Sequence, residues 1–161
     1  MAILDNIRNI MNKVIRIVCI LLFAFMVIIG TYQILVRYIF NSPSTVSEEL
    51  LTYSFTWMSL FAAAYVFGKR EHMRMGFLAD KLSEKKLTIL NAIIEIITIA
   101  FALIVMVYGG ISITSLSMTQ KTASLGIPMG YVYIVIPITG VVIAVYGVCL
   151  LYTSPSPRDC S

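Results

Sequence analysis

The chain has 161 residues, of which 59% are hydrophobic and 12% are charged, and its formal net charge at pH 7 is +4. A soluble domain of this size has about a quarter of its residues charged, because its surface faces water. The composition therefore excludes a soluble globular protein, and the mean hydropathy of +0.91 is typical of an integral membrane protein.

Four apolar runs are long enough to cross a bilayer, because a membrane-spanning helix needs about 20 residues. We expect spans at about 15–36, 50–68, 88–115 and 131–151. They leave no segment for a globular domain. The sequence therefore predicts an all-α membrane protein with one four-helix domain, 1–152. The Pro/Ser-rich segment 153–161 is expected to be a disordered tail or a sequence scar.

Lysine and arginine are distributed unevenly around these spans. Three precede the first span, one lies in the first loop, six in the second loop, one in the third loop and one in the tail. Cytoplasmic loops carry the positive excess, so both termini and the second loop are expected in the cytoplasm. The first and third loops would then face the periplasm of a bacterial inner membrane. The second-loop cations have a lipid- or nucleotide-binding patch as an alternative role, and nucleic acid is not an expected partner.

Residues 1–13 are predicted to form an amphipathic helix that lies in the membrane interface. At 100° per residue, the apolar residues of this region fall on one arc. They are Ile3, Leu4, Ile7, Ile10, Met11 and Val14. We expect the segment to rest on the inner leaflet and then turn into the first span. A signal peptide is the alternative, but the apolar run is too long and lacks a small-residue cleavage site.

The end of the first span carries a polar line. Gly30, Gln33 and Arg37 follow at spacings of three and four residues and share one helix face. Polar groups are costly in lipid and usually turn toward protein, so this face is expected to meet another helix. Extension of the Arg37 side chain to the lipid head groups is the alternative.

The second span is predicted to begin at Ser47 as N-cap. Glu48 and Glu49 then lie in the first turn, where the helix dipole favours negative charge. Arg37 lies at the same depth, which predicts an ion pair across the first loop. Further along, one face carries small residues on which membrane helices approach closely, namely Thr52, Thr56, Ser59 and Ala63.

The second loop contains the only histidine, His72, beside basic residues. A single histidine excludes a haem held by two histidines and disfavours a histidine-based metal site. The sequence shows no cysteine cluster, no paired carboxylates at depth and no nucleophile with an adjacent base. We therefore expect no catalytic residue, no metal and no cofactor.

Glu95 is the only charge inside an apolar run. On an ideal helix it shares a stripe with Thr88, Asn91, Thr98, Ala102 and Gly109. An embedded carboxylate indicates a proton or cation site. However, Glu95 lies only about 12 Å from the start of the span at 1.5 Å per residue, and this shallow depth favours a structural or inter-subunit role.

The last span contains two informative prolines. Pro128 suits the first turn of the helix. Pro137 lies inside the span, where it frees the carbonyl of Tyr133 and is expected to kink the helix.

Four motifs, in this order on a four-span scaffold, resemble the small membrane subunit of tripartite ATP-independent periplasmic (TRAP) transporters, over about residues 10–150. They are Arg37-Tyr38-x-Phe40-Asn41 followed by Ser47-Glu48-Glu49-Leu50, then Arg70-Glu71-His72-x-Arg74, then Leu125-Gly126-Ile127-Pro128, then Ile136-Pro137-x-x-Gly140. Two positions depart from the family pattern. Val46 replaces a frequent tryptophan, and Gly76 replaces a common aspartate.

The resemblance implies a non-catalytic subunit that braces a large membrane subunit. In that family the large subunit carries the substrate and sodium sites, and a soluble periplasmic protein delivers the substrate, often an organic acid carboxylate. The first and third loops would face the docked binding protein. Candidates for helix or subunit contacts are Gln33, Arg37, Tyr38, Glu48, Glu49, Thr52, Thr56, Ser59, Asn91 and Glu95.

The sequence agrees with this division of labour. It lacks the broken helix pair and the inverted repeat from which secondary transporters build a midplane site. A self-sufficient four-span exporter acting as a dimer is the alternative, but that mechanism needs a carboxylate deep in the first span, and none is present there.

Overall fold

The computed structural model describes residues 2–69 and 84–153. Within these ranges the chain forms helices joined by loops, with a single isolated bridge between Lys121 and Pro128. The helices are α1 (Ala2–Ile39), α2 (Thr45–Gly68), α4 (Glu84–Phe101), the π-helix η1 (Ala102–Gly109), α5 (Gly110–Ser117), α6 (Gly130–Tyr133) and α7 (Val135–Thr153). Four stretches of the described chain are long and apolar enough to span a membrane, namely Asn6–Ile39, Thr45–Gly68, Ile89–Ser117 and Gly130–Leu151. The predicted all-α fold with four spans is confirmed.

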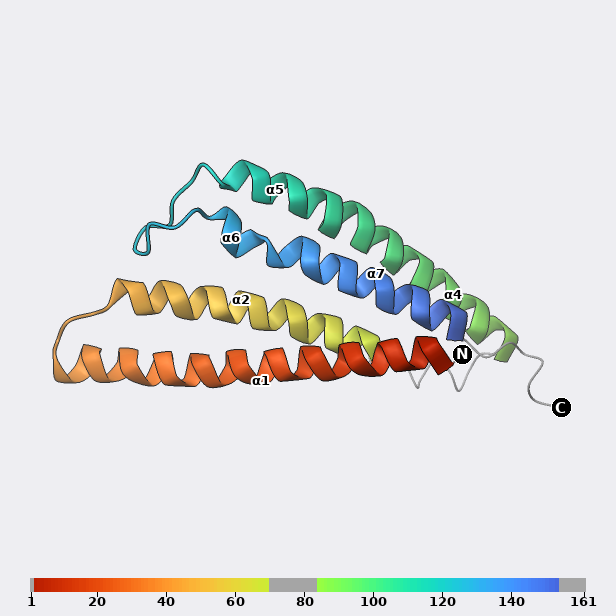
Figure 1. The fold of residues 1–161 in the computed structure, drawn as a ribbon, viewed down its shortest axis with the longest axis horizontal. Coiled ribbons are helices and arrows are strands. Elements are labelled where there is room, and N and C mark those ends of the chain that lie inside the picture. The colour runs from red at the N-terminus through yellow and green to blue at the C-terminus, as the bar shows by residue number, and fades with distance from the viewer. Residues whose placement is uncertain (1, 70–83, 154–161) are drawn as a thin grey trace.

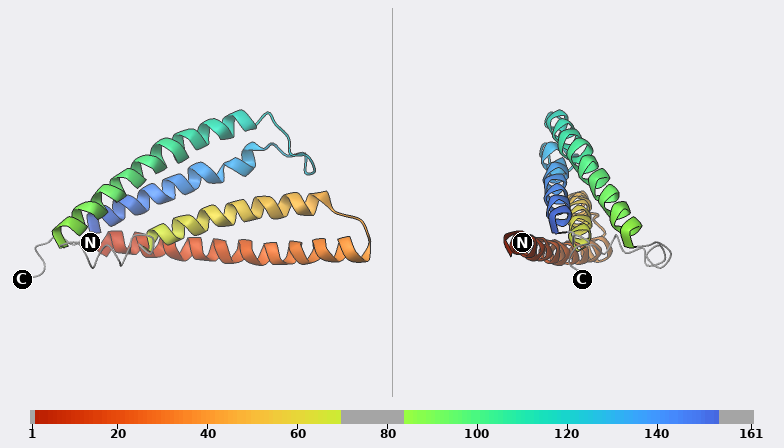
Figure 2. Two further views of the ribbon diagram at one scale, coloured as in Figure 1. Left: turned by 180° about the vertical axis from the view of Figure 1, so that it is seen from behind. Right: turned by 90° about the vertical axis from the view of Figure 1, so that its right-hand side faces the viewer.

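The helices fan out from one end of the molecule (Figure 1). The loops that follow α1 and α5 lie at the open end of the fan, which we call the loop end. The start of α1 and the end of α7 lie together at the other end. Figure 2 shows the same fan from behind and from the side, with α2 and α7 between α1 and α4. The cytoplasmic location of the termini stays a prediction from the charges.

The core runs along α7. In the apolar window of Gly130–Leu151, 44% of residues are buried, compared with 6% to 11% in the other three spans. Two glycines let the third span approach α7 closely. A Cβ atom on Gly140 would lie 2.7 Å from Met106 Cβ, and one on Gly147 would clash with Ile99. The other spans therefore leave most of their apolar surface uncovered by this chain.

The N-terminal segment is helical, as predicted, but it does not turn before the first span. α1 is one helix of 38 residues, because no proline or glycine interrupts positions 2–29. Part of its polar face packs on α7, where the Tyr146 hydroxyl donates a hydrogen bond of 2.7 Å to Asn12 Oδ1. Ile10 and Val14 are 56% and 53% exposed, so apolar side chains of this segment face outward.

The second span begins three residues earlier than predicted. Ser44, not Ser47, is the N-cap of α2, and its hydroxyl accepts from the Ser47 N–H at 3.4 Å. Ser47 is buried and donates its own hydroxyl to Ser44 Oγ at 3.0 Å. The sequence offers two serines in similar positions. Pro43 disfavours helical backbone at Ser42, and Ser44 is the first of the two serines after this proline. Glu49 therefore lies beyond the first turn of the helix.

The third span is not a uniform α-helix. The wide turns of η1 rotate its faces relative to an ideal helix, so the predicted alignment of Gly109 with Ala102 is wrong. Gly110 is buried instead, and a Cβ there would lie 2.8 Å from Pro137 Cδ. Helix geometry of this kind could not be inferred from a period of 3.6.

The fourth span is interrupted at Ile134, between α6 and α7, one turn before Pro137, where a kink is predicted. Pro137 has no N–H to donate to the carbonyl of Tyr133. Beside the interruption, the Val132 carbonyl accepts a hydrogen bond of 3.0 Å from the Trp57 indole of α2. The irregular backbone is thus stabilised by a neighbouring helix.

Candidate functional site at the loop end

Glu49 joins two parts of the chain that are far apart in the sequence. It lies near the start of α2, and its Oε2 accepts hydrogen bonds from the backbone N–H groups of Ser124 at 2.9 Å and Leu125 at 3.0 Å. Its Oε1 accepts from the Tyr53 hydroxyl at 2.5 Å, one turn further along α2. A carboxylate with three donors makes charge-assisted hydrogen bonds, which are stronger than neutral ones.

The loop that binds Glu49 is itself folded. Thr122 is 4% exposed, and its backbone N–H donates to the Ile127 carbonyl at 2.8 Å, while its hydroxyl accepts from the Ile127 N–H at 3.2 Å. Gly126 has a φ of 66°, a conformation that glycine adopts without steric cost. The Met129 N–H closes the loop on the Gln120 carbonyl at 2.8 Å. The N–H groups of Ser124 and Leu125 are therefore fixed in place.

Two of the four sequence motifs meet in this cluster. Glu49 belongs to the acidic motif at the start of the second span, and Leu125 begins the motif that ends at Pro128. Pro128 lies just before α6, which begins at Gly130, and its carbonyl accepts from the Tyr131 N–H at 3.2 Å. We call Glu49, Tyr53 and the loop 120–129 the Glu49 cluster.

Arg37 is not part of the Glu49 cluster. The predicted ion pair with Glu48 or Glu49 is not formed among these described residues. The two Glu49 oxygens are taken by Tyr53 and the third loop, and Glu48 is exposed. Arg37 lines a groove between α1 and α2 instead, together with Gly30, Gln33, Ile34, Tyr38 and Leu51. The polar line of the first span thus meets α2, where a Cβ on Gly30 would lie 3.4 Å from Leu51 Cδ1.

The predicted small-residue face of α2 is not buried within this chain. Thr52, Ser59 and Ala63 are exposed and Thr56 is half-buried. Each hydroxyl donates to a carbonyl of its own helix, at 3.0 Å for Thr52 and Thr56 and 2.9 Å for Ser59. The buried small residues of α2 lie on the opposite face of an ideal helix; they are Ser47, Ser54, Ala64 and Gly68.

Glu95 is 3% exposed, and Asn91 before it on α4 is half-buried. One turn after Glu95, Ile99 packs against Gly147 of α7, so Glu95 lies on the α4 face nearest the core helix. Its structural or inter-subunit role stays a prediction. No group of three or more potential metal-ligating residues occurs in the described ranges. The loop motif Arg70, Glu71, His72 and Arg74 lies outside the described residues, as does the tail 154–161.

Sequence reasoning missed several members of this site. The spacing of four between Glu49 and Tyr53 was a usable signal, because such residues are neighbours on a helix. The backbone donors of Ser124 and Leu125 left no trace in residue type. The bond between Trp57 and the Val132 carbonyl was equally hidden, although the nearby proline indicated an irregular backbone.

The sequence is similar to known transporter components. Residues 26–154 match the family described as tripartite ATP-independent periplasmic transporters, DctQ component, a range that includes the whole Glu49 cluster. The sialic acid TRAP transporter small permease protein SiaQ of Vibrio cholerae is 31% identical over 143 residues, which cover 86% of this chain and 79% of the relative.

Two proteins of Haemophilus influenzae, provisionally named TRAP transporter small permease proteins, are also similar. One is 25% identical over 86% of both chains. The other is 26% identical over 84% of this chain and 82% of the relative. Together with the four apolar spans, these matches identify a multi-pass protein of the bacterial inner membrane. The chain belongs to the DctQ family of tripartite ATP-independent periplasmic transporter components.

Proposed function

We propose that this chain is the small, non-catalytic membrane subunit that braces the large transport subunit of a TRAP transporter and helps to dock its periplasmic binding protein. The transport would be driven by a cation, which we propose is sodium, and the cargo would be an organic acid carboxylate. Sialic acid, named for the Vibrio cholerae relative, is such a carboxylate and supports this cargo class.

The observation that carries the proposal is the incomplete burial of the bundle. Only the last span has a large buried share, 44%, while the first has 6%. Contact with lipid accounts for the exposed apolar side chains, but it does not account for a helix face made of small residues. The exposed face formed by Thr52, Thr56, Ser59 and Ala63 is suited to close contact with another helix.

The hydroxyls of this face support a protein contact in an apolar environment. Because they already donate to carbonyls of their own helix, burial against a neighbouring protein would leave none of these donors unsatisfied. The face therefore costs little to desolvate. It is smooth enough for a second helix to approach the backbone of α2.

The loop end supports the docking role. It carries the folded loop of the Glu49 cluster. It also carries Tyr38, in the last turn of α1, and Phe40, just after α1, which are 78% and 72% exposed. Under the predicted topology this end faces the periplasm. A rigid loop and exposed aromatic side chains are typical of protein contacts.

The test is co-purification of the chain with a large TRAP membrane subunit expressed together with it. The double variant T56L and S59L enlarges two side chains of the small-residue face, and we expect it to lose the partner and to abolish uptake. T31L is the matched control, because Thr31 is exposed on α1 and its hydroxyl also donates to its own helix, at 2.7 Å. Accumulation of a solute by liposomes that contain this chain alone would refute the proposal.

A further inference from the structure

The groove between α1 and α2 at the loop end has, apart from Tyr38, no role in the function proposed above. It has a volume of about 390 Å³, within the range of small-molecule sites. Gly30, Ile34 and Leu51 make its apolar part, and Gln33, Arg37 and Tyr38 make its polar part. Arg37 lies in the last turn of α1, so the groove is cationic toward the helix end and apolar toward the middle of the span.

We propose that this groove binds one anionic phospholipid, with the phosphate on Arg37 and an acyl chain along Ile34 and Leu51. A guanidinium binds phosphate through two parallel hydrogen bonds. The Gln33 amide and the Tyr38 hydroxyl add neutral donors. Gly30 lies seven residues before Arg37, about 10 Å along the helix, so the apolar part of the groove reaches the hydrocarbon when Arg37 is at head-group level.

The charge that lines the groove favours an external anion. Arg37 is its one charged lining residue, and no carboxylate lines it. At the same end of α2, Glu48 is exposed and forms no ion pair with Arg37 in the described part of the chain, and Glu49 accepts from Tyr53, Ser124 and Leu125. The Arg37 side chain is exposed and therefore available to a ligand. A phospholipid supplies both groups in the right order: its phosphate would lie at Arg37, and its acyl chain would lie along the apolar part of the groove.

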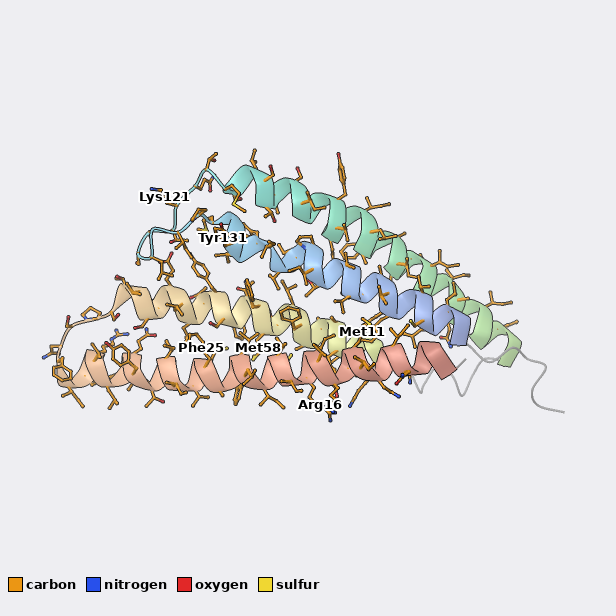
Figure 3. The ribbon with its side chains drawn as sticks, in the orientation of Figure 1. Met11, Arg16, Phe25, Met58, Lys121 and Tyr131 are labelled. Carbon is orange, nitrogen blue, oxygen red and sulfur yellow. The ribbon has the colours of Figure 1, made fainter. Side chains whose placement is uncertain are left out.

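The test uses the full chain, purified in detergent, stripped of lipid and titrated with short-chain phosphatidylglycerol, with bound lipid counted by native mass spectrometry. We expect one tightly bound lipid. R37Q should weaken binding of the lipid about five-fold, which is the contribution of one basic residue to binding at a membrane surface. G30L should weaken it similarly, because the new side chain fills the groove while every polar group is retained. K121Q is the matched control for charge, since Lys121 is exposed at the same end of the molecule (Figure 3).

Four results would overturn the proposal. An equal loss in R37Q and K121Q would mean general surface attraction, and unchanged binding in G30L would place the lipid elsewhere. Complete displacement of the lipid by inorganic phosphate would indicate a simple anion site. Release of the lipid when the large subunit is added would show that protein fills the groove. Unfolding curves from the fluorescence of Trp57, the only tryptophan, verify that each variant is folded. The bracing role is measured separately, by co-purification, so failure of the lipid proposal and failure of the proposed function can be told apart.

Discussion

Glu49 and Leu125 are 76 positions apart, yet the Glu49 carboxylate accepts a hydrogen bond of 3.0 Å from the Leu125 backbone N–H. The same oxygen accepts from the Ser124 N–H at 2.9 Å. This contact ties the start of the second span to the loop before the fourth. The two halves of the fan separate toward the loop end (Figure 1). Glu49 connects them there, together with the contact of the Tyr53 hydroxyl with Met129 Sδ at 3.9 Å and the bond from Trp57 to the Val132 carbonyl.

Replacing Glu49 with glutamine should lower the stability of the protein. The variant loses the charge and replaces one of the two acceptor oxygens with an NH2 group, so that a donor faces a donor at one position. We therefore expect a loss of about 1–3 kcal/mol, the usual cost of leaving buried hydrogen-bonding groups unsatisfied. Thermal unfolding in detergent, followed by Trp57 fluorescence, measures it. E48Q is the matched control, because Glu48 is the exposed neighbour, and equal losses in both variants would contradict the role of Glu49.

Replacing Tyr53 with phenylalanine should have a smaller effect. It removes one of three donors to Glu49, and we expect a loss of about 0.5–1.5 kcal/mol. Because the two residues share one network, Y53F should cost less in the E49Q background than alone. Additive losses in a double-mutant cycle would show that the hydroxyl does not act through Glu49.

Replacing Trp57 with phenylalanine tests the support of the interrupted fourth span. The variant keeps an aromatic ring but leaves the Val132 carbonyl without its indole donor. We expect a loss of about 1–3 kcal/mol, measured by circular dichroism during heating. F55L should be nearly neutral, because Phe55 is 56% exposed on the same helix. A stable W57F protein would mean that the carbonyl finds another donor.

Replacing Gly147 with alanine tests the close contact of the third and fourth spans. The new Cβ would collide with Ile99, and overpacking of this kind costs about 1–3 kcal/mol. G109A is the matched control, because the nearest atom to a Cβ there is the Ile104 carbonyl oxygen at 3.9 Å. G109A should therefore be neutral or slightly stabilising, since alanine favours helix over glycine. Unfolding temperatures of both variants in the same detergent decide the outcome, and a stable G147A would refute the tight packing.

The sequence predicted the fold class well because apolar length is a direct requirement of the bilayer. It also predicted a kink at Pro137, because a missing N–H is a local property of one residue, and the structure has an interruption at Ile134, one turn earlier. It failed where geometry depends on a neighbour. The partner of Glu49 is a backbone amide and not the guanidinium of Arg37, and two nearby serines gave no basis for choosing the correct cap of α2. The π-turns of η1 left no pattern that a period of 3.6 could reveal.

The length of α1 has a consequence for the surrounding lipid. Its 38 residues measure about 57 Å at 1.5 Å per residue, while the hydrocarbon layer is about 30 Å thick. The excess has to be taken up by inclination, by projection into the aqueous phase or by local thickening of the membrane. Arg16 points away from the other helices (Figure 3), so it limits how deeply α1 can be inserted before a cation enters the hydrocarbon. Bilayers of different thickness should therefore change the tilt and the insertion depth of α1.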